Sequence, residues 1–196
     1  MAAPSGCCRR HIERAVRDKL PWVRRKLAEM ASRPPAPRRL WADGEMLPYL
    51  GTSYPLCLVP DGGAPVRLRG GRFLMEPTVA ADGRRHMIAW YVAHAGPLLA
   101  RRVEHFGTTV GAPPASIEVK DLGRRWGTCH ADGRIRFHWQ IVLFPRPVVD
   151  YIVVHELAHL LELNHSRRFW GHVEAALPEY REHKAWLKQE SGPFTL

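Results

Sequence analysis

Hydrophobic residues recur along the chain with two different spacings, which separate helical from extended segments. An apolar residue at every third or fourth position predicts an amphipathic helix over residues 9–31. The proline-rich stretch 33–39 cannot continue that helix, so we expect a linker there. Residues 40–79 alternate short apolar runs with turn residues. This pattern predicts short strands, with hairpin turns signalled at Asp43-Gly44 and Gly70-Gly71.

The middle of the chain combines a helical pattern with an alternating one. An apolar stripe with helical spacing predicts a helix over residues 83–106, and 116–122 is expected to be a strand. Residues 124–144 are typical of a β-hairpin that turns at Asp132-Gly133. The second arm of this hairpin is expected to place Ile135, Phe137, Trp139, Ile141 and Leu143 on one face and Arg134, Arg136, His138 and Gln140 on the other.

Further helices are expected toward the end of the sequence. Pro147 suits a first helical turn, so it predicts the start of a long helix that reaches about Leu163. Ser166 is a favourable N-cap for a helix over 168–177, and a last helix is expected over 180–188. Short strands, a helix, a hairpin and then more helices predict an α+β fold with an antiparallel or mixed sheet.

Composition narrows the class of protein. The chain has 196 residues, of which 45% are hydrophobic and 24% charged, so it suits one globular domain or one domain with an appendage. These values exclude a collagen, a coiled coil and a disulfide-rich secreted module. The net charge of +10 is uneven, because residues 1–40 hold 11 Lys/Arg and 3 Asp/Glu. This basic arm predicts a weak, salt-dependent contact with nucleic acid, although a solvated helix face explains it more simply.

The cysteines and the N-terminus bear on the cellular compartment. Cys7, Cys8, Cys57 and Cys129 have no CxxC spacing, which is typical of reduced cysteines. The first residues lack the apolar core of a secretory signal, and no run of about 18 apolar residues is present. We therefore expect a cytoplasmic protein that does not enter the membrane.

The candidate chemistry centres on the sequence HELAH at residues 155–159. His155 and His159 are four positions apart, so a helix places both on one face, where they can converge on one metal ion. Glu156 can lie beside the open coordination position and accept a proton from water. Apolar neighbours would bury this helix, and buried polar groups need a partner. Zinc is expected, because catalytic zinc keeps three protein ligands and an exchangeable water.

A third ligand is expected downstream. His165 lies six residues after His159, which is the spacing of the third histidine in HExxHxxGxxH. Glu162 occupies the glycine position of that motif, so we expect the helix to continue to Asn164 and His165 to fold back from the turn. The alternative third ligands are the downstream acids Glu174 and Glu179, with His172 as a weaker candidate.

The segments RRWGTC, GRIRFHWQIVLFP and VVDYIVVHELAHLLELNHSRRFW resemble those of the YgjP-like zincin metallopeptidases, which are related to the SprT-like and WLM groups. The resemblance extends from about Pro21 to Leu187. It implies a zincin-like fold in which the sheet packs against the HExxH helix and helices follow. It also implies that Zn2+ is bound by His155, His159 and His165, with Glu156 as the general base.

The same resemblance suggests a substrate site. RRWGTC is similar to the WGSC strand of the family, so Trp126 and Gly127 are expected near the cleft as substrate-binding residues. Strand edges of this kind bind extended peptides through the backbone. The main hypothesis is therefore a zinc metallopeptidase that acts on peptides or proteins. The expected organisation is a basic helical segment with a linker (1–37), a small β-rich subdomain (38–80) and a zincin-like core (81–196).

Two other hypotheses remain open. The same metal site could hydrolyse a phosphoanhydride or another small anionic substrate such as a nucleotide, with arginines receiving the anionic oxygens. The third hypothesis is a nucleic-acid-associated protein that binds through its basic N-terminal arm. The arginines of the second hypothesis are Arg124, Arg125, Arg167 and Arg168.

Overall fold

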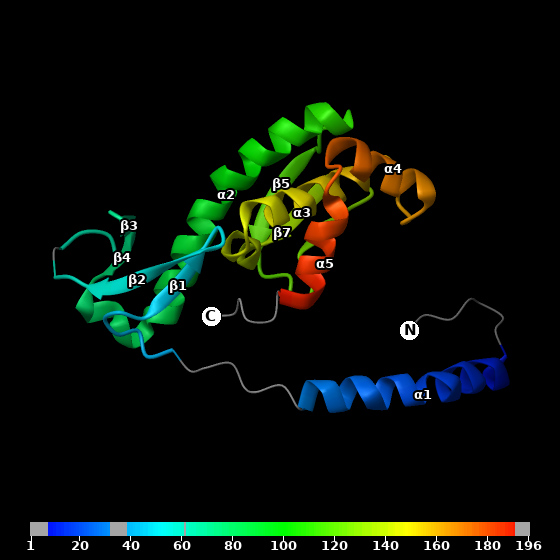
Figure 1. Ribbon diagram of the computed structural model, residues 1–196, viewed down its shortest axis with the longest axis horizontal. Coiled ribbons are helices and arrows are strands. Elements are labelled where there is room, and N and C mark those ends of the chain that lie inside the picture. Colours follow the sequence, from blue (N-terminus) through cyan, green and yellow to red (C-terminus); the bar gives the residue numbers. More distant parts are fainter. Residues whose placement is uncertain (1–7, 32–38, 61, 191–196) are drawn as a thin grey trace. The chain divides into compact units, whose positions relative to one another are not determined.

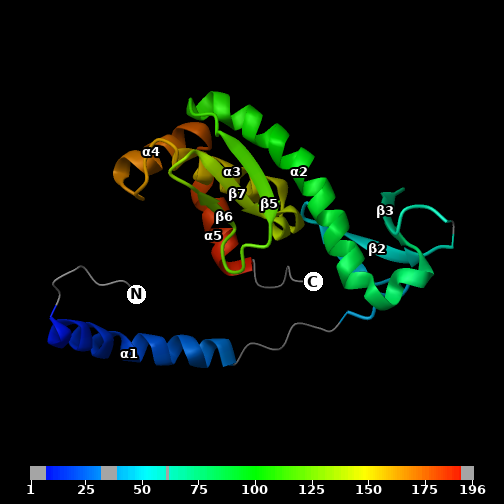
Figure 2. The same ribbon diagram turned by 180° about the vertical axis from the view of Figure 1, so that it is seen from behind.

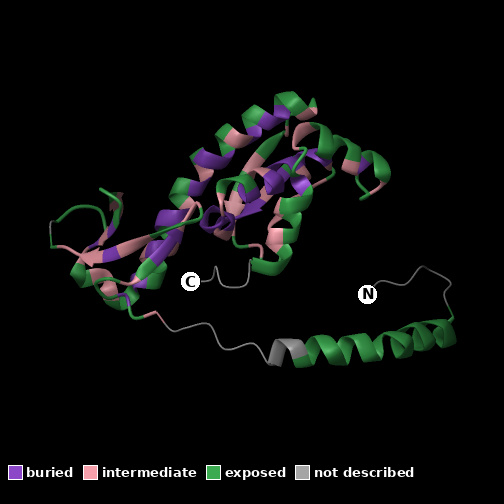
Figure 3. Ribbon diagram, viewed as in Figure 1, coloured by how far each residue is buried: buried purple, intermediate pink, exposed green. Residues whose placement is uncertain are grey.

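The computed structural model describes residues 8–31, 39–60 and 62–190, and its contacts divide the chain into two compact units, 1–38 and 39–196. In the first unit, α1 (Arg9–Ala31) forms the expected amphipathic helix. Its side chains are exposed throughout residues 9–28, the apolar stripe included (Figure 3). The predicted contact of this basic helix with nucleic acid stays a prediction.

The second unit contains two small mixed sheets. The four-stranded sheet has the order β1-β2-β4-β3, with β2 parallel to β4, and the three-stranded sheet has the order β5-β7-β6, with β5 parallel to β7. The first sheet consists of β1 (Met46–Tyr49), β2 (Thr52–Leu58), β3 (Val66–Arg69) and β4 (Arg72–Met75). The second consists of β5 (Ser116–Lys120), β6 (Gly127–Cys129) and β7 (Arg134–His138).

Helices cover and connect these sheets. The long helix α2 (Gly83–Val110) contacts β3 of the first sheet and β5 of the second, and both views show it running past them (Figures 1 and 2). Short 3-10 segments precede it (Pro77–Asp82) and follow β7 (Trp139–Leu143). The chain ends in α3 (Arg146–Ala158), α4 (Arg167–Ala176) and α5 (Tyr180–Glu190).

Helix α3 lies at the centre of the second unit. It packs against α2, α4, α5 and β6, and most of its residues are buried. The core continues along the inner face of α2 and into both sheets (Figure 3). This arrangement confirms the α+β class. Among the described residues, no helix has an apolar stretch long enough to cross a membrane.

The first hairpin turns at a different place from the one expected. Its turn is Leu50-Gly51, where both residues have positive φ, rather than Asp43-Gly44. Leu50 donates its N–H to the carbonyl of Val142 at 2.8 Å, so a contact with a distant segment holds this turn. Asp43 instead accepts the N–H of Leu58 at 2.6 Å. The turn at Gly70-Gly71 joins β3 to β4 and is confirmed.

The strand expected up to residue 144 ends earlier, at His138. The Nδ1 atom of His138 accepts the N–H of Gln140 at 3.1 Å and begins the 3-10 turn, so that amide is not available to a strand ladder. Three consecutive residues, 141–143, are then fully buried, which an alternating strand does not allow. His138 was expected on the polar face but is only 3% exposed.

A bidentate ion pair joins α2 to α3. Arg102 donates from Nε and Nη2 to the two carboxylate oxygens of Asp150, at 2.6 and 2.8 Å. The same guanidinium lies 5.0 Å from the centroid of the Phe106 ring. Both charged side chains are largely shielded, with 21% and 13% of their surface exposed. A paired, shielded contact of this kind stabilises the position of α3 more than a surface ion pair does.

We therefore expect Asp150→Ala to lower the free energy of unfolding by about 1–3 kcal/mol, because it leaves a shielded guanidinium without its partner. Asp82→Ala is the matched control, since it removes an exposed ion pair with Arg85 and should cost less than about 1 kcal/mol. Urea unfolding of both variants measures the difference. Equal losses in the two variants would contradict the role assigned to Arg102 and Asp150.

Candidate active site

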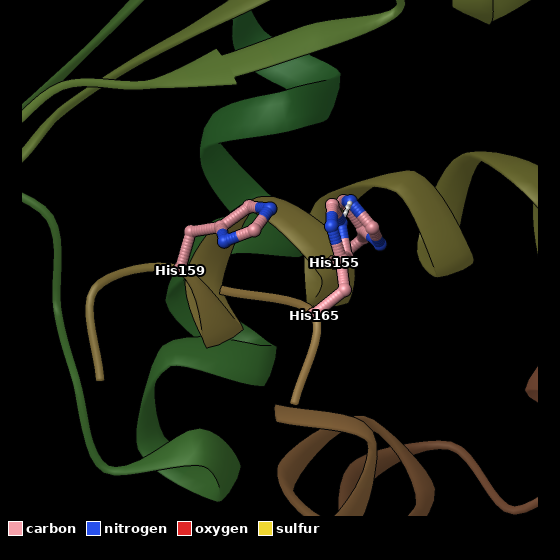
Figure 4. A group of neighbouring side chains, drawn as sticks. All are labelled: His155, His159 and His165. Atoms are coloured by element: carbon pink, nitrogen blue, oxygen red, sulfur yellow. Dashed lines mark hydrogen bonds between the residues drawn. The ribbon is translucent and has the colours of Figure 1, made fainter. Parts of the chain in front are cut away.

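Three histidine side chains converge at the end of α3 (Figure 4). His155 lies in the last turn of α3, His159 directly follows the helix, and His165 comes from the loop that precedes α4. One ring nitrogen from each lies within 4.8 Å of the other two. The Nε2 atoms of His155 and His165 are 3.1 Å apart. The sequence prediction that these three residues meet is thus reproduced by the geometry.

The turn after α3 brings His165 to this position. The helix was expected to continue to Asn164, but it ends at Ala158. At that point the hydrogen bonds tighten to pairs three residues apart, with the N–H of Leu160 donated to the Leu157 carbonyl at 3.0 Å and that of Leu161 to the Ala158 carbonyl at 3.1 Å. This compact turn reverses the chain within a few residues, so no glycine is needed at position 162.

The ring of His159 is oriented by the same turn. Its Nδ1 donates to the carbonyl of Glu162 at 3.2 Å, which leaves the Nε2 lone pair free to bind a cation. The Nδ1 of His155 is buried and has no hydrogen-bond partner among the described residues. A buried polar atom without a partner is costly. The Nε2 atom of the same ring faces His165 and is therefore the nitrogen available to a cation.

A buried phenylalanine supports all three rings. Phe169 is fully buried, and its ring centroid lies 5.0, 4.5 and 4.7 Å from those of His155, His159 and His165. The predicted N-cap holds the start of α4 in place, because the Ser166 hydroxyl accepts the Phe169 N–H at 3.3 Å. Sequence analysis missed Phe169, since no motif marks an aromatic residue that supports a ligand set.

The histidines are electrostatically suited to a cation. Burial, with smaller contributions from His159, His165 and Lys184, lowers the pKa of His155 to about 3. Burial also lowers the pKa of His159, although the Glu162 carbonyl opposes this shift. Neutral imidazoles are the form that binds zinc, and nitrogens around a tetrahedral zinc are on the order of 3.3 Å apart. The 3.1 Å spacing of His155 and His165 fits this requirement.

Glu156 lies beside the histidines in an apolar setting. It is 6% exposed, and burial raises the pKa of its carboxyl group to about 8. No hydrogen bond to this carboxyl group is found among the described residues. A bound cation would favour the ionised form, which is the form that accepts a proton.

A cleft of about 340 Å³ is lined by one of these histidines, His155, and by Glu156. Trp126 and Gly127, the residues expected at the substrate site, line it together with His155 and Glu156. Their contact with substrate stays a prediction. The remaining lining residues are Arg124, Arg125, Tyr151, Ile152 and Leu187.

Tyr151 is a cleft residue that sequence analysis missed. It lies one helical turn before His155, and their ring centroids are 5.9 Å apart. Burial raises the pKa of its hydroxyl to about 12, so the hydroxyl stays protonated and can donate a hydrogen bond. Its spacing of four residues from His155 was the available signal, because it places both side chains on one face of the helix.

The alternative third ligands lie elsewhere. Glu174 is paired with Arg181, at 2.6 Å, and His172 and Glu179 are exposed outside the histidine cluster. Of the arginines considered as anion-binding residues, Arg167 and Arg168 are exposed on α4 and do not line the cleft.

An α+β fold with three converging imidazoles and a buried glutamate beside a cleft has the donor set of a metallohydrolase. The YgjP-like family, described as a metallopeptidase domain, matches residues 1–190, so the chain belongs to this family of hydrolytic enzymes. Among solved structures, it is similar to the metallopeptidase zymogen abylysin of Pyrococcus abyssi, with 24% identity and a TM-score of 0.42 over 47% of this chain and 95% of that one. Comparison with curated proteins found no match.

If His165 completes the ligand set, His165→Ala should lose bound zinc, because the two remaining imidazoles bind the ion far more weakly than three donors. His172→Ala should keep the zinc content of the wild type, since His172 is an exposed histidine outside the cluster. Metal analysis of the purified proteins tests both variants. Wild-type zinc content in His165→Ala would show that another residue is the third ligand.

Zinc binding should also release a proton from Glu156. With a pKa of about 8 this carboxyl group is mostly protonated at pH 7, and a nearby divalent cation lowers that pKa. At pH 7, Glu156→Gln should therefore release fewer protons than the wild type on zinc binding. Above about pH 9 the difference should vanish, because the carboxyl group is already ionised. Calorimetry in buffers of different ionisation enthalpy measures the release, and equal release at pH 7 would contradict this assignment.

Proposed function

We propose that the chain is a zinc-dependent peptidase. The observation that carries the proposal is the convergence of three imidazole donors, one of which, His155, lines a cleft together with the buried Glu156. Membership of the YgjP-like metallopeptidase family supports it. Family membership does not identify the metal, its ligands or the roles of the cleft residues in this chain, and the proposal assigns each of these.

In this proposal His155, His159 and His165 hold the zinc ion. When bound, the ion would supply Lewis-acid activation of a water molecule and of the scissile carbonyl group. Glu156 accepts a proton from the attacking water and later gives it to the leaving amine. Burial suits Glu156 to both transfers, because it raises the proton affinity of its carboxylate.

The edge strand β6 offers a place for an extended substrate. It is the outer strand of the order β5-β7-β6, and it pairs only with β7 in the described sheet. The carbonyl of Trp126 accepts the N–H of His138, and the N–H of His130 donates to Arg134 on the same partner strand. Along an antiparallel strand, the backbone N–H and C=O groups of successive residues point alternately toward the partner strand and away from it. Because the neighbouring Trp126 is bonded to β7, the N–H and C=O of Gly127 point away from β7. These groups can pair with a peptide backbone.

The walls of the cleft favour a peptide with an apolar side chain near the scissile bond. Trp126, Ile152 and Leu187 supply apolar surface beside His155. Tyr151 adds a protonated hydroxyl at the same wall, which can donate to a substrate carbonyl. Apolar walls with a few polar groups are typical of small ligand-binding clefts.

Two arginines at the cleft keep a second candidate function open, the hydrolysis of a phosphoanhydride such as that of a nucleotide. Arg124 and Arg125 are exposed at the rim of the cleft, and their side chains have no ion pair among the described residues. Arginine is well suited to anionic oxygens. The same two arginines can also bind an acidic side chain of a peptide, so they do not decide between the two functions.

The zinc-loaded protein should cleave a mixed peptide library, and Glu156→Gln should lower kcat by about 100-fold or more, because general-base catalysis contributes about 100- to 10,000-fold. Glu182→Gln, an exposed glutamate on α5, is the matched control and should retain activity. Mass spectrometry of the products gives both the rate and the residues at the scissile bond.

The same preparations should be given nucleoside triphosphates, with phosphate and pyrophosphate release as the measurement. Hydrolysis of nucleotides that Glu156→Gln abolishes, with no peptide cleavage, would replace the peptidase proposal by the second candidate. Full peptidase activity in Glu156→Gln would refute the assignment of the general base.

A further inference from the structure

The backbone conformation at position 127 does not require a glycine. Eight of the described glycines have positive φ, a conformation that other residues seldom adopt. Gly127 is not among them, and it lies in regular antiparallel pairing opposite Phe137. Its backbone conformation is open to any L-residue, so the reason for a glycine must be sought in the space around its Cα atom.

That space is filled by Glu156. A Cβ atom built on Gly127 would lie 2.5 Å from Oε1, 2.6 Å from Cγ and 2.7 Å from Cδ of Glu156. All three nearest atoms belong to this one side chain, and all three distances are shorter than real Cβ contacts allow. The carboxyl end of Glu156 therefore lies directly against the Cα atom of Gly127.

Packing determines the position of this carboxyl group. Glu156 is 6% exposed, and among the described residues no donor holds its oxygens. On one side its backbone is fixed by α3, whose neighbouring residues Val153 and Leu157 are fully buried. On the other side lies β6, which is attached to β7 by the hydrogen bond from His138 to the carbonyl of Trp126 at 2.9 Å.

We propose that Gly127 is a positioning residue for Glu156: the missing side chain on β6 provides the space in which the general base lies. This inference rests on the proposed function. It also changes the expectation for Gly127, which the resemblance presented only as a substrate-binding residue. The N–H and C=O groups of Gly127 point to the open edge of β6. The absence of a side chain on its Cα atom leaves room for the carboxyl group of Glu156.

The two sides of the contact differ in how easily they move. The strand is held by its ladder and by Phe137, which is fully buried, whereas the atoms in conflict are the flexible end of a glutamate side chain. An alanine at 127 should therefore be accommodated by rotation of Glu156. Gly83 provides a contrast, because its built Cβ meets the ring of Trp41 at 2.6 Å, a rigid side chain of the core.

The test is Gly127→Ala in the zinc-loaded full chain. We expect kcat to fall about 100-fold, as is typical when a catalytic group is misplaced by about an ångström, with KM and zinc content unchanged. The pH profile of kcat should lose the limb that reports the base. Gly171→Ala is the control, because its Cβ meets nothing within 4 Å and the helix position is exposed, so all four readouts should match the wild type.

A second readout does not depend on activity. Carbodiimide labelling followed by mass spectrometry should modify Glu156 slowly in the wild type and in Gly171→Ala, because the side chain is buried. Labelling should be faster in Gly127→Ala, where the carboxyl group is displaced toward solvent, while the exposed Glu182 serves as the internal reference. Unchanged labelling of Glu156, or unchanged kcat in an active preparation, would overturn the proposal.

A variant that fails to fold is also informative. In Gly127→Ala/Glu156→Ala the atoms in conflict are absent, so this double variant should fold even if Gly127→Ala does not. Failure of the double variant as well would place the conflict elsewhere and overturn the proposal. If the wild type hydrolyses no peptide, the proposed function fails, and the labelling experiment still decides the role of Gly127.

Discussion

Helix α3 carries the polar groups of the site through the most apolar part of the fold, and this conflict between burial and polarity governs the site. Its residues on either side of the motif are buried, and so is Glu156 itself. Burial lowers the pKa of His155 to about 3 and raises that of Glu156 to about 8, so both groups are held in their neutral forms. Apolar surroundings thus favour the neutral forms of His155 and Glu156 together, and a divalent cation bound at the three histidines would compensate for the missing charge.

The sequence predicts the existence of this helix and the convergence of the three histidines, because that information is local, although the helix ends earlier than expected. The four-residue spacing of His155 and His159 needs only helical geometry, and the apolar residues around them identify the buried helix. The N-cap at Ser166 is likewise a local signal and is confirmed by its hydrogen bond to Phe169. His165 was expected to fold back toward the metal, and the structure brings its ring to His155.

The features that the sequence did not predict depend on contacts between distant segments. The turn at Leu50 is held by the carbonyl of Val142, which no local pattern reveals. The early end of the strand at His138 is the local exception, because that side chain accepts the amide of Gln140 only two residues further on, which the alternating pattern does not reveal. The support that Phe169 gives to three imidazoles, and the space that Gly127 gives to Glu156, are likewise visible only once α3, α4 and β6 are packed. Periodicity predicts which residues share a face, but it does not say what that face meets.

The wall of the cleft opposite α3 depends on a second buried histidine. The Nδ1 of His138 accepts the Gln140 amide, so its Nε2 carries the proton and donates to Asp121 at 3.2 Å. Asp121 also accepts the N–H of Gly123 at 2.7 Å, and the His138 N–H binds the carbonyl of Trp126. The loop with Arg124 and Arg125 is therefore attached at both ends to β7. Because the arginines stand on an anchored loop at the cleft, in the proposed function they would select among substrates by charge without moving Glu156 or the histidines.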